Sequence, residues 1–108
     1  MKEHFVSLDA AKRLKSLGFN SLTTCFYNEL HYPGSLLPNM NNILNQHNTP
    51  HISMAPTWFQ CFKWIAICFK HVEGISKLLS VVFENNHKPE TILNHCLTLI
   101  EEHILKGA

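Results

Sequence analysis

The sequence predicts a small α+β protein in which a mostly antiparallel sheet packs against two to three helices. Three observations carry this prediction. The stretch 55–70, APTWFQCFKWIAICFK, has the composition of a buried helix, and both ends of the chain carry helical patterns. Two other segments, rich in aromatic or branched apolar residues, have the character of strands. Such a mixture in 108 residues is typical of the α+β class, in the order helix, strand, optional short strand, helix, strand, helix.

The predicted central helix begins after Thr57. Thr57 and Gln60 have the spacing of a capping box, and Pro56 holds the residue before it extended. Almost all of the following side chains are apolar, whereas Gln60, Lys63 and Lys70 share one narrow stripe. A helix that is apolar over most of its circumference is buried on more than one side. We therefore interpret this helix as the core of the protein.

One face of the central helix carries Trp64 in its middle. Cys61 precedes Trp64 by three residues and Cys68 follows it by four, so the three side chains line one face. We expect this face to be covered by the last helix, which would place Trp64 in the core.

The first predicted helix runs from Ser7 to about Leu17. Serine is a favourable N-cap residue, and the segment has an acidic start and a basic end, which suit the helix dipole. Gly18 and Phe19 form a stop signal. Glycine takes the left-handed conformation after a helix, and the following apolar residue can pack back on the last turn.

The strands are predicted in segments bounded by turn formers. Residues 22–32, LTTCFYNELHY, read as a strand exposed on one side, and Pro-Gly at 33–34 as a turn. Residues 36–50 are rich in Asn and Pro and read as a loop, with 43–44 as a brief strand. Residues 75–84, ISKLLSVVFE, read as a buried strand, and a helix is the alternative for so short an apolar run.

The last predicted helix carries Pro89 in its first turn, after a cap at Asn86 or His87. Apolar side chains recur along it with helical spacing. They are Ile92, Leu93, Cys96, Leu97, Ile100 and Ile104.

Length and charge narrow the class of protein. The chain fits a single domain, residues 1–108, and its 45% hydrophobic content is too high for a disordered chain. A net charge of +1 with scattered signs argues against a dedicated nucleic-acid binder and against a polybasic membrane anchor.

The start MKEHFVSLDA lacks the apolar run of a signal peptide, and the central helix is too short and too charged to span a bilayer. We therefore expect a cytoplasmic protein.

Cysteines and histidines are the side chains that could carry chemistry. The four cysteines are Cys25, Cys61, Cys68 and Cys96. All lie in apolar runs, which predicts buried hydrophobes rather than a disulfide framework.

Among the eight histidines, His47 and His51 are four apart, but Thr-Pro between them breaks helical geometry, and there is no C-x-x-C pair. His95 and Cys96 are adjacent and point in different directions on a helix. We predict no metal, no cofactor and no catalytic residue.

Three aromatic side chains of the central helix leave two alternatives open. Either other helices cover Trp58, Phe62 and Trp64, or a protein partner or second copy does, because exposed aromatic patches mark interfaces. The basic residues of the first helix are typical of a solvated helix surface, and we expect no nucleic-acid partner and no membrane.

Three motifs suggest a relationship. In FVSLDAAKRLKSLGFNSLTTCFY, a helix ends in Leu-Gly-Phe before a Cys/Phe/Tyr strand, and APTWFQCFKW and NHCLTLIEEHI follow. The motif residues are Ala55, Pro56, Thr57, Gln60, Phe62, Trp64, Cys96, Leu97, Leu99 and Ile100. This pattern resembles small uncharacterised proteins carried by phages and mobile elements of Bacteroides-like bacteria. The chain departs from them after the central helix, where those proteins usually have aromatic-rich strands.

The resemblance implies an α+β fold and a phage or prophage origin, and it carries over no catalytic residue. We favour a non-enzymatic protein-binding or assembly module that acts in the cytoplasm of a bacterial host. The alternative hypothesis is a metal- or thiol-dependent enzyme that uses some of the histidines and cysteines.

Overall fold

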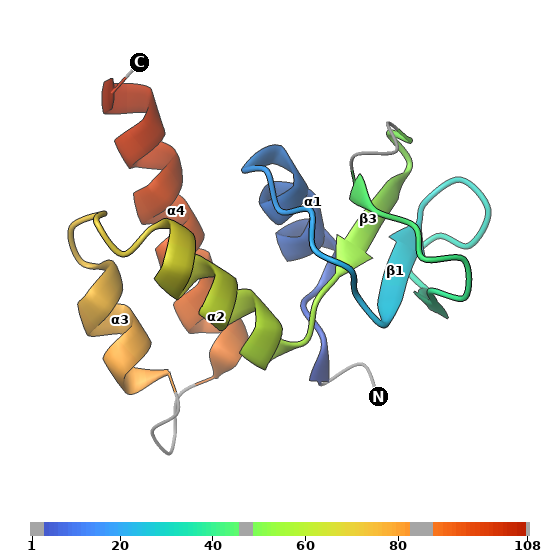
Figure 1. Ribbon diagram of the computed structural model, residues 1–108, viewed down its shortest axis with the longest axis horizontal. Coiled ribbons are helices and arrows are strands. Elements are labelled where there is room, and N and C mark those ends of the chain that lie inside the picture. Colours follow the sequence, from blue (N-terminus) through green and yellow to red (C-terminus); the bar gives the residue numbers. More distant parts are fainter. Residues whose placement is uncertain (1–3, 46–48, 83–87, 108) are drawn as a thin grey trace. The chain divides into compact units, whose positions relative to one another are not determined.

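The computed structural model describes residues 4–45, 49–82 and 88–107. Its elements follow in the order α1, β1, β2, β3, α2, α3, α4. The chain divides into two compact units, Met1–Phe59 and Gln60–Ala108, and each is described by itself. The first unit holds α1 and a three-stranded antiparallel sheet, and the second is helical (Figure 1). The α+β class is confirmed, and the single domain stays a prediction.

Helix α1 spans Leu8–Ser16 and begins where the sequence predicts. The Ser7 side chain accepts a hydrogen bond from the backbone N–H of Ala10 at 3.2 Å. This satisfies one of the N–H groups that the start of a helix leaves open. The buried face of α1 consists of Ala10, Ala11 and Leu14. Helix α1 contacts β3 and lies beside it in Figure 1.

The end of α1 is a Schellman motif, as the stop signal predicts. Gly18 has a φ of 98°, and its N–H donates to the carbonyl of Lys15 at 3.1 Å. The N–H of Phe19 donates to the carbonyl of Leu14 at 2.9 Å. These two bonds satisfy carbonyls at the end of the helix, and Phe19 folds back into the core, where it is buried.

The sheet has the strand order β2-β1-β3. The strands are β1 (Cys25–Asn28), β2 (Leu36–Pro38) and β3 (Ile52–Ala55). Phe26 in the central strand pairs with Leu37 on one side and Met54 on the other. Phe26 and its neighbours Cys25 and Tyr27 are all buried, although they face opposite sides of the sheet. The predicted exposure of one side of this strand is therefore wrong.

Strand β1 is shorter than the predicted strand over residues 22–32. Its end is set by Asn28, whose side-chain oxygen accepts hydrogen bonds from the N–H groups of Leu30 and His31, both at 3.2 Å. An asparagine that bonds the backbone ahead of it turns the chain. A second turn follows at 33–34 as predicted, where Gly34 has a φ of 77°.

Two short strands lie where the sequence analysis assigns none. Strand β2 falls within the predicted loop 36–50, and β3 covers the unassigned residues 52–55, whereas 43–44 form no strand. All four residues of β3 are buried. A buried four-residue strand lacks the alternation of apolar and polar residues by which strands are recognised. The third strand therefore precedes the central helix instead of following it.

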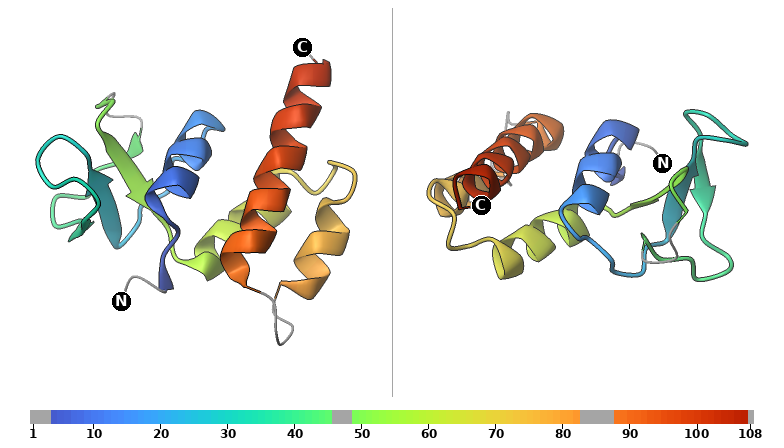
Figure 2. Two further views of the ribbon diagram at one scale, coloured as in Figure 1. Left: turned by 180° about the vertical axis from the view of Figure 1, so that it is seen from behind. Right: turned by 90° about the horizontal axis from the view of Figure 1, so that it is seen from above.

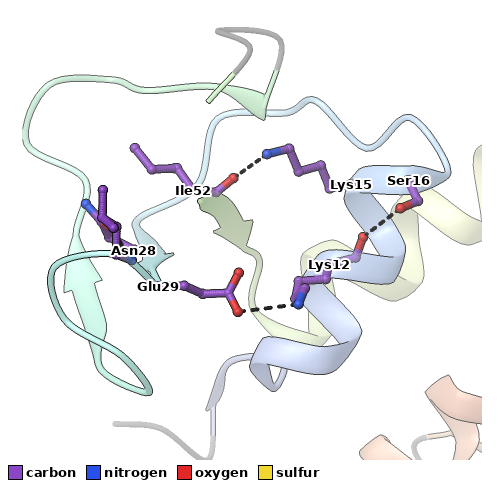
Figure 3. Close-up of polar contacts among 7 residues, drawn as sticks. Lys12, Lys15, Ser16, Asn28, Glu29 and Ile52 are labelled. Carbon is purple, nitrogen blue, oxygen red and sulfur yellow. Dashed lines mark hydrogen bonds and ion pairs between the residues drawn. The ribbon is translucent and has the colours of Figure 1, made fainter. Parts of the chain in front are cut away.

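The outer edge of β3 is closed by two polar side chains. The Lys15 ammonium donates to the carbonyl of Ile52 at 2.6 Å (Figure 3) and to that of Thr49 at 2.7 Å. The side-chain oxygen of Asn45 accepts from the N–H of Met54 at 3.0 Å. An open strand edge is a template for pairing with another chain. These contacts occupy backbone groups that such pairing would need.

Asparagines give the Asn-rich connection its order. Asn45 is buried, and besides its bond to Met54 its amide donates to the carbonyl of Phe19 at 2.7 Å. The side chain of Asn39 accepts from the N–H of Ile43 at 2.8 Å and donates to the carbonyl of the same residue at 2.9 Å. Each amide uses both its donor and its acceptor, so these hydrogen bonds order residues 39–45 of the connection.

The segment before α1 closes the core of the first unit. Phe5 forms an antiparallel bridge with Thr57, and the N–H of Val6 donates to the carbonyl of Pro56 at 3.0 Å. The buried hydroxyl of Tyr27 donates to the carbonyl of Val6 at 2.8 Å. A buried tyrosine hydroxyl needs such a partner. These contacts hold the segment that leads into α2 against the sheet.

The helices of the second unit are α2 (Trp58–Cys68), α3 (Ile75–Val81) and α4 (Pro89–Gly107). Helix α2 begins directly after Thr57, as predicted, and its first two residues belong to the first unit. Helix α3 contacts α4, and Figure 2 shows the two side by side.

Helix α3 overturns the predicted strand at 75–84, of which 83 and 84 lie outside the described residues. The helix follows Gly74, which has a φ of 91° and whose carbonyl accepts from the N–H of Leu78 at 3.2 Å. Ile75 is buried, whereas Lys77 and Ser80 are exposed. This spacing matches a helical period, but the apolar run that follows obscures it in the sequence.

Helix α4 confirms the predicted apolar stripe. Its buried side chains are Ile92, Leu93, Cys96, Leu97 and Ile100. Ile104, which the prediction includes, is 46% exposed, so the buried stripe ends one turn earlier. The predicted cap at Asn86 or His87 lies outside the described residues.

Helix α2 buries a different arc from the one predicted. Its buried residues are Cys61, Phe62 and Ile65, whereas Trp64 is half-buried. The Trp64 ring packs edge-on against Phe69, with ring centroids 5.2 Å apart. On a helix, position 64 lies at the flank of the face defined by 61 and 65, so Trp64 borders the core instead of filling it.

Candidate functional site

A hollow with a volume of about 720 Å³ lies between α3 and α4. It is lined by Gly74, Lys77, Leu78, Thr91, Asn94, His95, Thr98, Leu99 and Glu102. We call it the α3–α4 groove. Leu78 and Leu99 are half-buried and supply apolar surface, while the other lining residues that have a side chain are polar and exposed.

The groove follows from how the two helices bury their apolar faces. Helix α4 turns its apolar stripe inward, which leaves Thr91, Thr98 and Glu102 on the outer side. Helix α3 is anchored by the fully buried Ile75. Because α3 and α4 contact each other, their outer surfaces border one channel with an apolar part and a polar rim.

A second hollow of about 320 Å³ adjoins the groove. It is lined by Val72, Glu73, Leu99, Glu102, His103 and Lys106. Leu99 and Glu102 line both hollows, so they form one continuous surface along α4. The rim carries charges of both signs, from Lys77 and Lys106 and from Glu73 and Glu102. Such a surface suits contact with a protein segment that has an apolar side and polar edges.

Gly74 lets the turn before α3 approach α4 closely. A Cβ atom at this position would lie 3.1 Å from Cδ1 of Leu99, and the φ of 91° disfavours any residue with a side chain. We expect Gly74→Ala to lower the free energy of unfolding by about 1–2 kcal/mol, measured by urea titration. Gly107→Ala is the matched control, since a Cβ there meets no atom within 4 Å. Equal stability of the two variants would contradict the close approach.

The predicted interface residues of α2 lie in different environments. Phe62 is only 3% exposed and packs in the core, whereas Trp58 and Trp64 are half-buried. The apolar residues that α2 exposes are Phe59 and Ile67, both 67% exposed. Their exposure is not evident from the sequence because they lie four residues on either side of Lys63, on the predicted polar stripe. That spacing is the signal that could have found them.

The cysteines depart from the prediction at one position. Cys25, Cys61 and Cys96 are buried, but Cys68 is exposed because it is the last residue of α2, where the cover of that face ends. Burial raises the pKa of the Cys25 thiol and raises that of Cys96 to about 11. Burial, with a smaller contribution from Cys96, also raises the pKa of Cys61. These three residues are therefore thiols at neutral pH.

We expect native protein to react with a thiol reagent at one site. Because the thiolate is the reactive form, Cys68 should be labelled rapidly at neutral pH, and Cys25, Cys61 and Cys96 only on unfolding. Peptide mapping after a short exposure checks this result. Rapid labelling of Cys61 or Cys96 in the folded protein would contradict their burial.

The raised thiol pKa values predict a loss of stability in alkali. Between pH 9.0 and about 11 the unfolded chain releases the Cys96 proton while the folded chain keeps it. The contribution of this thiol to stability is therefore complete below pH 9.0 and falls as the pH rises towards 11. Urea unfolding across this range should show the fall, and Cys96→Ala should reduce its slope. An unchanged slope in the variant would contradict the assignment.

Lysines of α1 have partners inside the first unit. The Lys12 ammonium pairs with the Glu29 carboxylate at 3.3 Å, and Lys15 donates to the carbonyl of Ile52 in β3 (Figure 3). Lys15 also donates to the carbonyl of Thr49. Burial lowers the pKa of Lys15, and the Glu29 charge partly offsets this effect. The basic turn of α1 thus serves the fold at these two positions.

The histidines that the structure describes do not gather into a metal centre of three ligands. Within residues 4–45, 49–82 and 88–107, no group of three or more His, Cys, Asp and Glu side chains could hold a metal ion. His51 is half-buried, and its predicted companion His47 lies outside these ranges. As expected, His95 is exposed and the neighbouring Cys96 is buried.

Comparison with protein families, with curated proteins and with solved structures finds no match. In the part of the chain that the structure describes, no helix has both the length and the apolar character required to cross a bilayer.

Proposed function

We propose that this chain is a non-enzymatic protein-binding or assembly module whose contact surface is the α3–α4 groove. The observation that carries the proposal is the groove itself, with apolar surface from Leu78 and Leu99 inside a polar rim. A channel between two helices fits a third helix, whose apolar side chains would pack on the two leucines. The proposed occupant is an amphipathic helix of a partner protein.

The charges of the rim would set the orientation of such a helix. Lys77 lies on the α3 side of the groove and Glu102 on the α4 side. A partner helix with acidic residues along one edge and basic residues along the other would match both. Charge complementarity of this kind contributes to specificity and to the rate of association more than to affinity.

The proposed origin and location rest on the sequence. The Leu-Gly-Phe, Ala-Pro-Thr and Cys-Leu motifs resemble phage and mobile-element proteins, so we propose a phage or prophage protein that acts in the bacterial cytoplasm. An assembly role in the cytoplasm needs no catalytic residue. We favour it over a thiol enzyme because Cys61 and Cys96 are buried with raised pKa values.

The proposal is tested by blocking the groove from its rim. Thr98 is exposed and lines the groove, and Thr98→Arg would place a long charged side chain there without changing the buried stripe. The purified chain and this variant are used to capture proteins from a lysate of a Bacteroides-like host. Ser76→Arg is the matched control, since Ser76 is exposed on α3 and does not line the groove.

We expect a discrete partner that binds the parent and Ser76→Arg equally and is lost with Thr98→Arg. Circular dichroism and thermal unfolding confirm that both variants are folded. A partner that Thr98→Arg retains at full affinity would overturn the groove as the contact surface. Absence of any partner, together with turnover of a substrate, would favour the enzyme hypothesis instead.

A further inference from the structure

Two histidines of the second unit lie against each other. His71 is in the turn between α2 and α3, and His103 is one turn before the last residues of α4. Their ring centroids are 5.3 Å apart, and the ring planes form an angle of 71°. Both residues are exposed, so solvent ions can reach them.

The turn that carries His71 is ordered by local hydrogen bonds and approaches α4 at Gly74. Val72 is buried, its N–H donates to the carbonyl of Phe69 at 3.0 Å, and its carbonyl accepts from the N–H of Ile75 at 3.2 Å. Gly74 approaches Leu99, which lies one helical turn before His103. These contacts bring the turn against the part of α4 that carries the second imidazole.

The spacing of the two rings matches a shared metal ion. A zinc–nitrogen bond is about 2.0–2.1 Å long, so a bound ion lies about 3.2 Å from the centre of each imidazole. Two imidazoles on one tetrahedral ion therefore have centroids about 5.2 Å apart. We propose that His71 and His103 together bind one divalent transition-metal ion, Zn²⁺ or Ni²⁺, with water as the remaining ligands. Imidazole is a preferred ligand of both ions.

The charges around the pair favour a cation. Glu73, Glu102 and Lys106 line the same hollow as His103, so two carboxylates and one ammonium group belong to its surroundings. The uncharged ring of Phe69 also lies near His71, with ring centroids 6.4 Å apart. Because a metal binds the neutral imidazole, acidification should weaken binding.

A second histidine pair in the chain provides an internal comparison. His31 and His51 of the first unit have ring centroids 6.3 Å apart. A single ion between rings at that distance would require a nitrogen–metal–nitrogen angle of roughly 160°, far from tetrahedral. The same residue types at this wider spacing should not form the site.

Isothermal titration of Zn²⁺ and of Ni²⁺ into the full chain without a His-tag, at neutral pH, tests the proposal. The parent protein should bind one equivalent of ion, and the ion should raise its midpoint of thermal unfolding. His71→Ala and His103→Ala should each lose both effects. His95→Ala and His31→Ala should keep both, because neither residue belongs to the pair. Cys68→Ser should also keep them, which separates the pair from the exposed thiol.

Three results would overturn the proposal. The first is that the parent protein binds neither ion. The second is that His71→Ala or His103→Ala binds the ions like the parent, and the third is that His31→Ala loses metal binding to the same extent as these two variants. Since His71 and His103 are exposed, their alanine variants should remain folded, and circular dichroism verifies this. If a variant were misfolded, imidazole NMR signals of the parent would decide, since zinc should shift those of His71 and His103 alone.

Discussion

Phe62→Ala should destabilise the protein by about 3–5 kcal/mol, while Phe59→Ala should change its stability by less than about 1 kcal/mol. The two residues are the same type, three positions apart on α2, and differ in environment: Phe62 is 3% exposed and Phe59 67% exposed. Truncating a buried phenylalanine removes apolar contacts and leaves a cavity, whereas an exposed ring has little buried area to lose. Urea unfolding of both variants measures the difference.

The expected loss for Phe62 is a large part of the total stability of a small domain, roughly 5–15 kcal/mol. The loss of stability caused by Trp64→Ala should lie between the losses caused by the two phenylalanine substitutions, because Trp64 is half-buried against Phe69. If Phe59→Ala were the more damaging change, the face of α2 assigned to the core would be wrong.

Asn45→Ala should lower the free energy of unfolding by about 2–5 kcal/mol. The change removes the partners of two backbone groups, the carbonyl of Phe19 at 2.7 Å and the N–H of Met54 at 3.0 Å. A buried backbone group without a partner costs about 1–3 kcal/mol, and Asn45 serves two. Asn41→Ala is the control, because Asn41 is exposed in the same connection and should change stability by about 0.5 kcal/mol or less.

Hydrogen exchange adds a readout specific to this role. In Asn45→Ala the Met54 amide should exchange much faster relative to the other amides of the sheet, since its acceptor is gone. Stability and exchange that match those of Asn41→Ala would show that Asn45 does not hold Phe19 and β3 together.

Local signals account for the parts of the fold that the sequence predicts well. The Ser7 cap and the Gly18–Phe19 stop of α1 act through neighbouring residues, so their geometry is visible in the sequence. The same is true of the apolar stripe of α4, whose helical period extends over several turns.

Strand positions depend on contacts that a sequence does not display. Strand β3 has four buried residues, and two side chains bind its outer edge. Lys15 donates to the carbonyl of Ile52, 37 residues away in the sequence, and Asn45 accepts from the N–H of Met54, 9 residues away. The apolar run near 75–82 permits both strand and helix, and the approach of Gly74 to Leu99 belongs to the folded helical arrangement. Such long-range choices override local propensity.

The sequence indicates that the protein has a surface for contacts, but it does not indicate which residues form that surface. An apolar helix with a few polar residues indicates a surface for contacts, but Phe59 and Ile67, not Phe62, are the large apolar residues that α2 exposes. The α3–α4 groove combines residues from two helices, one of which the sequence analysis reads as a strand. No pattern within either segment predicts their pairing.

The central claim, that the protein acts by binding a partner through the α3–α4 groove, is tested most directly by site-specific photo-crosslinking. A photoreactive residue is placed at Thr91 or His95, which are exposed and line the groove, and at Ser76 or Lys12, which are exposed and do not. After irradiation in host cells, we expect the two groove positions to yield the same discrete adduct and the other two to yield none. Adducts of equal yield at all four positions, or an adduct at Ser76 and Lys12 alone, would contradict the account.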